Sequence, residues 1–302
     1  MPTIFNLVVW GEQWVNRYDI IKQLYTVPAN KMVIIHTQHE GVSLKATGIL
    51  QVVDEWVAST GRDPATVNFN TPNHYEKINY KFSNHIPNKF YHTFFKQSLI
   101  KYHCNYIPIN LNSKLFGLFL GRYTPIRNTI ACNIVANYYP NFLISVMNAD
   151  RLGAEQWWDP EIEVVGSLDN ASIPDQYDNK HNTNQSLLQF YNDFQIELAV
   201  ETVTQGEAFF ITEKTVRPIM GSKPFMTYAT TNFLANLRDL GFRTFGKLWS
   251  EDYDQYEGIE RWNRMHLVIS NIIEQGYDCD LAQEIVQYNY NHLHNNIIIR
   301  HE

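Results

Sequence analysis

The stretch that most constrains this chain is a strand–helix–strand pattern within residues 194–230. A short apolar run at 196–200 ends at Glu201, a polar loop follows, and a second apolar run spans 224–228. Short apolar runs bounded by such loops form buried strands of a parallel sheet. The right-handed crossover between two parallel strands puts the start of the intervening helix at the carboxyl edge of the sheet. We therefore predict a βαβ unit whose helix begins at Thr212.

The residues at this predicted sheet edge combine an anion site with carboxylates. Thr212 can cap the helix, and a capped helix start attracts anions such as phosphates. Lys214 and Arg217 add two cations about one turn apart. Glu201 and Glu213 supply carboxylates that accept hydrogen bonds from sugar or ribose hydroxyls. A Thr-Glu-Lys tripeptide alone is more typical of a solvated helix start. The flanking residues favour a site for a sugar nucleotide.

The same residues carry a resemblance to a known family. The pattern resembles the donor-binding motif of α1,3-fucosyltransferase-like glycosyltransferases, which reads Phe-x-Glu-Asn, a short loop, and then Tyr-Ile-Thr-Glu-Lys. Glu201 stands at the acidic position, Thr202 stands where Asn is usual, and residues 210–214 read Phe-Ile-Thr-Glu-Lys. Gly221 and the following Lys-Pro-Phe continue the pattern into the next strand. The resemblance spans residues 115–275 and is strongest over 194–245.

A second part of the resemblance opens the predicted carboxyl-terminal domain. An apolar strand is expected at 115–120, followed by Gly-Arg-Tyr-Thr-Pro-Ile-Arg at 121–127 and a helix. Viral and bacterial relatives of the family open this domain with Asn-Arg, a spacer and His-Arg, and Arg122 and Arg127 occupy those places. Arg127 is expected in the first helical turn, facing the same crevice as Lys214. A guanidinium can bind diphosphate oxygens in a bidentate way.

The expected architecture is α/β, with two Rossmann-like domains facing a cleft, as in GT-B type glycosyltransferases. Repeated strand–helix alternation supports the α/β class by itself, and 302 residues suit two domains. We expect an acceptor-side domain at 1–113 and a nucleotide-sugar-binding domain at 114–302. The last helix, 280–295, is expected to cross back onto the first domain, as in two-Rossmann glycosyltransferases.

The resemblance implies an inverting glycosyltransferase that moves a sugar from a nucleotide-sugar donor to an acceptor hydroxyl. The base that deprotonates the acceptor then comes from the first domain, where Glu40 is our first candidate, His39 the second and Asp54 the third. An ordinary loop role for Glu40 is equally open. Asp278 and Asp280 formally match the Asp-x-Asp motif of metal-dependent transferases, but Asp280 is more simply a helix N-cap. We expect no metal and no cofactor besides the donor.

The charge, the cysteines and the amino-terminal residues limit which binding partners and which cellular location we expect. The net charge of −7 argues against broad electrostatic binding of nucleic acid. Three widely spaced cysteines are expected as free thiols, and the amino terminus shows neither a signal peptide nor a membrane span. We therefore predict a cytoplasmic protein of open oligomeric state. Its acceptor would be a glycan or a hydroxymethylated DNA base; the alternative is a non-catalytic nucleotide- or glycan-binding module of the same fold.

Overall fold

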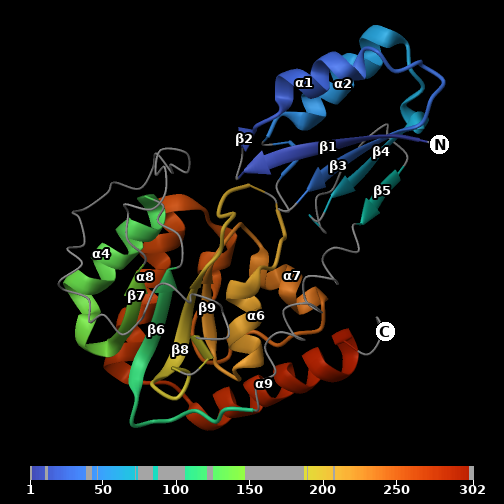
Figure 1. Cartoon of the computed structure of the whole chain (residues 1–302). Coiled ribbons are helices and arrows are strands. Elements are labelled where there is room, and N and C mark those ends of the chain that lie inside the picture. Colours follow the sequence, from blue (N-terminus) through green and yellow to red (C-terminus); the bar gives the residue numbers. More distant parts are fainter. Residues whose placement is uncertain are drawn as a thin grey trace. The chain divides into compact units, whose positions relative to one another are not determined.

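The chain forms two compact α/β units in a computed structural model (Figure 1). One unit comprises Met1–Thr93 with Gln205–Phe210, and the other comprises Phe94–Thr204 with Ile211–Glu302. The boundary predicted at residue 114 and the crossing of the last helix stay predictions. The structure describes residues 2–10, 13–38, 43–45, 47–71, 73, 84–87, 106–120, 125–146, 187–188, 190–206 and 208–298.

The first unit is built on a mainly parallel sheet. Its strand order is β2-β1-β3-β4-β5, and only β2 runs antiparallel to its neighbour. Alternate residues of the inner strands, such as Leu7, Ile35 and Phe69, form a buried apolar face. Figure 1 shows helices α1 and α2 of this unit on the same side of the sheet. The strands are β1 (Thr3–Trp10), β2 (Gln13–Trp14), β3 (Val33–Gln38), β4 (Val67–Thr71) and β5 (Asn84–Pro87), and the helices are α1 (Arg17–Leu24), α2 (Ile49–Thr60) and a 3-10 turn (Pro64–Thr66).

The first helix, α1, begins only at Arg17. Gln13 and Trp14 instead form β2, which pairs with the end of β1. The carboxamide of Asn16 fixes this hairpin, because its Oδ1 accepts from the Val8 N–H at 3.0 Å and its Nδ2 donates to the Asn6 carbonyl at 3.0 Å. A helix through these residues would lose all of these contacts. The second helix, α2, begins at Ile49 and is capped at its end by Gly61, whose backbone lies in the left-handed region.

The segment Gln205–Phe210 belongs to the first unit, although it connects two elements of the second. The Phe209 N–H donates a 3.0 Å hydrogen bond to Oδ1 of Asn73, and both residues are buried. Ala208 and Phe210 are buried as well. The polar loop expected after Glu201 therefore ends in an apolar segment that packs in the first unit.

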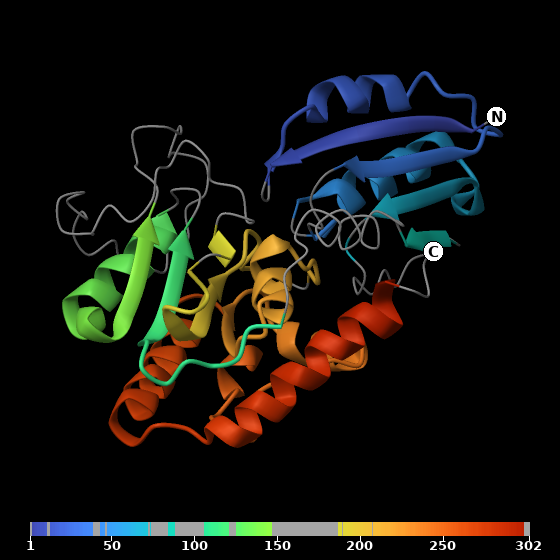
Figure 2. The same cartoon turned by 60° about the horizontal axis from the view of Figure 1, so that its bottom comes forward.

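The second unit contains an entirely parallel sheet, which Figure 2 shows from a second direction. Its strand order is β7-β6-β8-β9. The predicted βαβ unit is confirmed, because parallel β8 and β9 flank α6 and Thr212 is the N-cap of α6. The strands are β6 (Lys114–Leu120), β7 (Phe142–Val146), β8 (Phe194–Val200) and β9 (Phe225–Tyr228). The helices are α4 (Pro125–Tyr138), α6 (Glu213–Met220), α7 (Phe233–Asp239), α8 (Gly258–Gln275), α9 (Cys279–His292), short 3-10 turns (Tyr139–Asn141 and Asp252–Gln255) and a π-helical end (Leu293–Ile298).

The start of α9 corrects one expectation. Asp278, not Asp280, is the N-cap, and its Oδ1 accepts a 3.0 Å hydrogen bond from the Leu281 N–H. Asp280 lies in the first turn, where its carboxylate interacts favourably with the positive end of the helix dipole. One carboxylate of the Asp-x-Asp pattern is therefore already engaged with the backbone.

Two further expectations concern the chain as a whole. Cys132 and Cys279 are free thiols, and Cys104 lies outside the described residues. In the part of the chain that the structure describes, no helix has the length and apolar character needed to cross a membrane. The cytoplasmic location stays a prediction.

Candidate functional site

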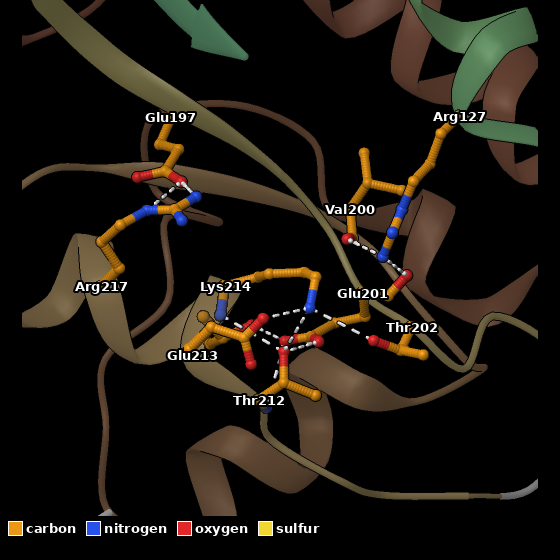
Figure 3. Close-up of polar contacts among 10 residues, drawn as sticks. Arg127, Glu197, Val200, Glu201, Thr202, Thr212, Glu213, Lys214 and Arg217 are labelled. Atoms are coloured by element: carbon orange, nitrogen blue, oxygen red, sulfur yellow. Dashed lines mark hydrogen bonds and ion pairs between the residues drawn. The ribbon is translucent and has the colours of Figure 1, made fainter. Parts of the chain in front are cut away.

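The candidate site lies where β8 ends and α6 begins (Figure 3). Glu201 directly follows β8, and its buried carboxylate reaches the helix start. Its Oε1 accepts from the Thr215 hydroxyl at 2.6 Å and from the Thr212 N–H at 3.4 Å, and its Oε2 accepts from the Thr212 hydroxyl. Burial raises the pKa of Glu201, although the Lys214 charge and the two threonine hydroxyls act in the opposite direction. Glu201 thus ties the strand end to the helix start.

Thr212 caps α6 as the sequence predicted. Its Oγ1 accepts a 3.2 Å hydrogen bond from the Lys214 N–H while it donates to Glu201. A threonine in this position satisfies one of the free N–H groups of a helix start. The Thr212 N–H is also engaged, by Glu201. An incoming anion at this helix start would therefore depend on side-chain cations as well as on the backbone.

Lys214 and Glu213 form an ion pair at this helix start. Lys214 Nζ lies 2.5 Å from Glu213 Oε1 and donates to the hydroxyls of Thr202 at 3.2 Å and Thr212 at 3.4 Å. The side chains of Lys214 and Glu213 are 13% and 30% exposed, whereas Glu201 and Arg127 are buried. Burial opposes ionisation of Glu213, but the charge and hydrogen bond of Lys214 outweigh it and lower the pKa to about 2. The accessible charges of the cluster are thus one ammonium and one carboxylate.

Arg127 supports this site from the first turn of α4. Its Nη2 donates to the carbonyls of Val200 at 3.3 Å and Glu201 at 3.2 Å. Parallel strands leave free carbonyls at their carboxyl ends, and a guanidinium supplies donors for them. Arg127 therefore reaches the strand that carries Glu201, as Figure 3 shows, but its side chain is only 3% exposed.

The neighbouring strand end is held in a similar way. Arg261 Nη2 donates to the carbonyl of Thr227 at 2.9 Å and Nη1 donates to that of Thr230 at 3.1 Å. Asp254 pairs with Arg261 at 3.2 Å and accepts from the Leu234 N–H of α7 at 3.0 Å. Buried arginines thus bind the carbonyls at the carboxyl ends of both β8 and β9, which makes this sheet edge a rigid support.

Arg217 is placed differently from Lys214. Its guanidinium points into the second unit, pairs with the buried Glu197 of β8 and donates from Nε to the Tyr191 hydroxyl at 3.0 Å. Burial opposes ionisation of Arg217, yet the charge of Glu197 raises its pKa well above the usual range. In Figure 3 this pair lies apart from the Lys214 cluster. The structure does not bring Arg217 to the accessible charges.

Glu197 and Tyr191 are the residues that sequence reasoning missed. The signal for Glu197 was available, because a carboxylate within the apolar run of β8 needs a cationic partner when it is buried. No pattern in the sequence indicates that Tyr191 also donates to it. Both residues support the interior behind the site and have no solvent exposure.

Several predicted site residues cannot be placed. Arg122, His39 and Glu40 lie outside the described residues. Asp54 is exposed on α2. Over the described residues alone, no group of three or more His, Cys, Asp or Glu side chains is arranged to hold a metal ion.

Comparisons with known proteins give a structural likeness but no sequence match. No protein-family model and no curated protein sequence matches the chain. Among solved structures, the chain is similar to the crystal structure of an alpha1,3-fucosyltransferase, at 9% identity and a TM-score of 0.31. The match covers 98% of this chain and 92% of that chain.

Proposed function

We propose that the chain is a glycosyltransferase that moves a sugar from a nucleotide-sugar donor to an acceptor hydroxyl. The observation that carries this proposal is the accessible Lys214–Glu213 pair at the carboxyl end of β8. Ligands of open α/β sheets bind outside the carboxyl ends of the strands. A cation and a carboxylate at one such strand end match the diphosphate and the hydroxyls of a nucleotide sugar.

In this proposal the donor opens the Lys214–Glu213 pair. The ammonium of Lys214 moves to the diphosphate, and the carboxylate of Glu213 accepts hydrogen bonds from ribose hydroxyls. Negative charge builds on the diphosphate as the bond to the sugar breaks, so a fixed cation stabilises the transition state more than the bound donor. Losing one electrostatic contact of this kind raises the barrier by about 2.7–4 kcal/mol.

The buried residues around the pair act by positioning it. Glu201 and Thr212 hold the start of α6, and Arg127 holds the strand end that carries Glu201. We leave Arg217 out of the donor site, because its guanidinium is engaged with Glu197 in the interior. Arg122 stays a proposed diphosphate contact.

The chemistry of transfer is proposed to be inverting and independent of a metal. Glu40, or His39 in its place, would take the proton of the acceptor hydroxyl. A general base must lie within hydrogen-bond reach of the proton that it removes. The acceptor is proposed to be a glycan, or a hydroxymethylated base in DNA.

The donor site can be tested with single variants of the full chain. Lys214→Ala and Glu213→Ala should abolish detectable binding of whichever nucleotide sugar binds the wild type, in a calorimetric panel of GDP, UDP, CMP and dTDP conjugates. Lys247→Ala is a matched control, because Lys247 is an exposed lysine of the same unit. Unchanged affinity in both site variants, with folding intact, would contradict the assignment.

The alternative is a binding module of the same fold that does not turn over. Its supporting observation is that Lys214 is already paired with Glu213 and bonded to Thr202, where the family pattern has Asn. Release of free nucleotide from the bound conjugate, measured with and without sugar acceptors, separates the two functions. An enzyme releases nucleotide over many turnovers, whereas a binding module does not.

A further inference from the structure

The sheet of the first unit carries a row of polar side chains across three adjacent strands. Asn6 of β1 is the register partner of His36 of β3, and His36 is the partner of Asn70 of β4. His36 Nδ1 lies 3.2 Å from Asn6 Oδ1. Because side chains alternate along a strand, the row lies on the face opposite to the buried Phe5 and Ile35. We call Asn6, His36, Asn70 and the nearby Asn68 the amide row.

The composition of the amide row is unusual for its place. Strands of parallel sheets are normally apolar on both faces. Asn68, two residues before Asn70, adds a second carboxamide to this face of β4 and is only 4% exposed. The Oδ1 atoms of Asn68 and Asn70 are buried and have no hydrogen-bond partner among the described residues. Buried polar atoms almost always have a partner, so two unused acceptors on one strand call for a ligand.

The side chains of the row point to a neutral ligand with several hydroxyl groups. Asn6 is exposed and His36 and Asn70 are half-buried, so that solvent reaches the row. A carboxamide offers both donors and an acceptor. Neighbouring hydroxyls of a sugar ring likewise donate and accept. A phosphate would instead require cationic groups, which carboxamides do not supply.

The position of the row agrees with ligand binding. His36 and Asn70 lie in the second half of β3 and β4, toward the carboxyl ends where ligands of α/β sheets bind. We propose that the amide row binds a neutral sugar. This inference rests on the proposed function: the sugar is part of the acceptor, and the amide row positions it through hydrogen bonds.

The test uses the full chain without nucleotide. Glucose, galactose, mannose and N-acetylglucosamine serve as probes in ligand-observed NMR titrations, with glucuronate as a charged comparison. Asn70→Leu removes the unused acceptor and keeps the number and branching of the side-chain heavy atoms. We expect the best neutral sugar to bind this variant about ten-fold more weakly. Asn263→Leu, at an exposed position of α8, is the matched control and should bind as the wild type does.

The outcomes separate this inference from the proposed function. The inference is overturned if none of the four sugars binds the wild type, or if Asn70→Leu binds them equally well. If the inference is overturned in this way but Lys214→Ala still abolishes nucleotide-sugar binding, the proposed function holds without the sugar site at the amide row. If the sugars bind through Asn70 but no nucleotide sugar binds, the donor assignment fails and the amide row stands. Should Asn70→Leu not fold, Asn6→Leu applies the same test at an exposed position.

Discussion

Arg217 of α6 and Glu197 of β8 form an ion pair inside the second unit, with Arg217 Nε 3.1 Å from Glu197 Oε1. Tyr191 completes the group by donating to the same carboxylate. Gly221 must lack a side chain beside it, because a Cβ there would lie 2.1 Å from the Tyr191 ring. A buried ion pair thus holds α6, the helix whose start forms the candidate site, against the sheet.

Breaking this pair should destabilise the second unit strongly. Arg217→Met leaves the Glu197 carboxylate buried without its cation, which typically costs about 3–5 kcal/mol. The triple variant Arg217→Met, Glu197→Leu and Tyr191→Phe removes the polar groups of all three side chains and should recover much of that loss. Urea unfolding of each variant provides the measurement. Arg243→Met, in the exposed pair with Glu284, is the control and should change stability little. An equally mild effect of Arg217→Met would contradict the structural role.

Removing the cap should weaken both stability and donor binding. Thr212→Ala loses the acceptor of the Lys214 N–H and the hydroxyl donated to Glu201, so we expect a destabilisation of about 1–2 kcal/mol. Thr212→Ser keeps the hydroxyl and should behave nearly as the wild type. Thermal unfolding and nucleotide-sugar titration of the two variants form a matched comparison. If alanine and serine behave alike, the hydroxyl is not what holds the helix start.

Lys223 should make the stability of the second unit depend on alkaline pH. Its ammonium is buried and donates to the Pro108 carbonyl at 3.3 Å, and burial lowers its pKa from 10.5 to about 8. The folded state therefore releases this proton first. The buried positive charge of Lys223 destabilises the folded state fully below pH 8, and this penalty disappears as the pH rises toward 10.5. The free energy of unfolding should therefore increase across that window.

The corresponding variant is Lys223→Met. It should be more stable than the wild type at neutral pH, by an amount on the order of 3 kcal/mol, and should lack the rise between pH 8 and 10.5. Denaturant unfolding at a series of pH values measures both quantities. If the difference in unfolding free energy between Lys223→Met and the wild type does not change with pH, a titrating Lys223 is ruled out.

The Lys214–Glu213 pair predicts a shift in carboxylate titration. Burial alone would raise the pKa of Glu213, and Lys214 makes the largest contribution to lowering it to about 2. In Lys214→Ala the pKa of Glu213 should therefore rise, and NMR titration of its side-chain carboxyl carbon measures the change. Because the folded pKa is depressed, the stability from this pair is present above pH 4.5 and is lost as the pH falls toward 2. Lys214→Ala should weaken that acid dependence.

The sequence by itself determined the βαβ unit, the Thr212 cap and the α/β class. These features depend on local signals, namely short apolar runs, a capping residue and glycines at element ends, and such signals act within a few residues. The closeness of Glu201 to Thr212 also followed, because the crossover of a parallel pair brings the strand end to the helix start.

Tertiary structure alone decided which charges stay accessible. Arg217 and Lys214 are three residues apart on one helix, yet one is buried against Glu197 and the other faces Thr202 near the surface. Helix periodicity separates their directions, but only the packed strands supply the partner that draws Arg217 inward. The amide row likewise exists only through strand register, because Asn6, His36 and Asn70 are distant in sequence and meet only when three strands align. Partners far apart in the chain are chosen by packing, and no local pattern encodes that choice.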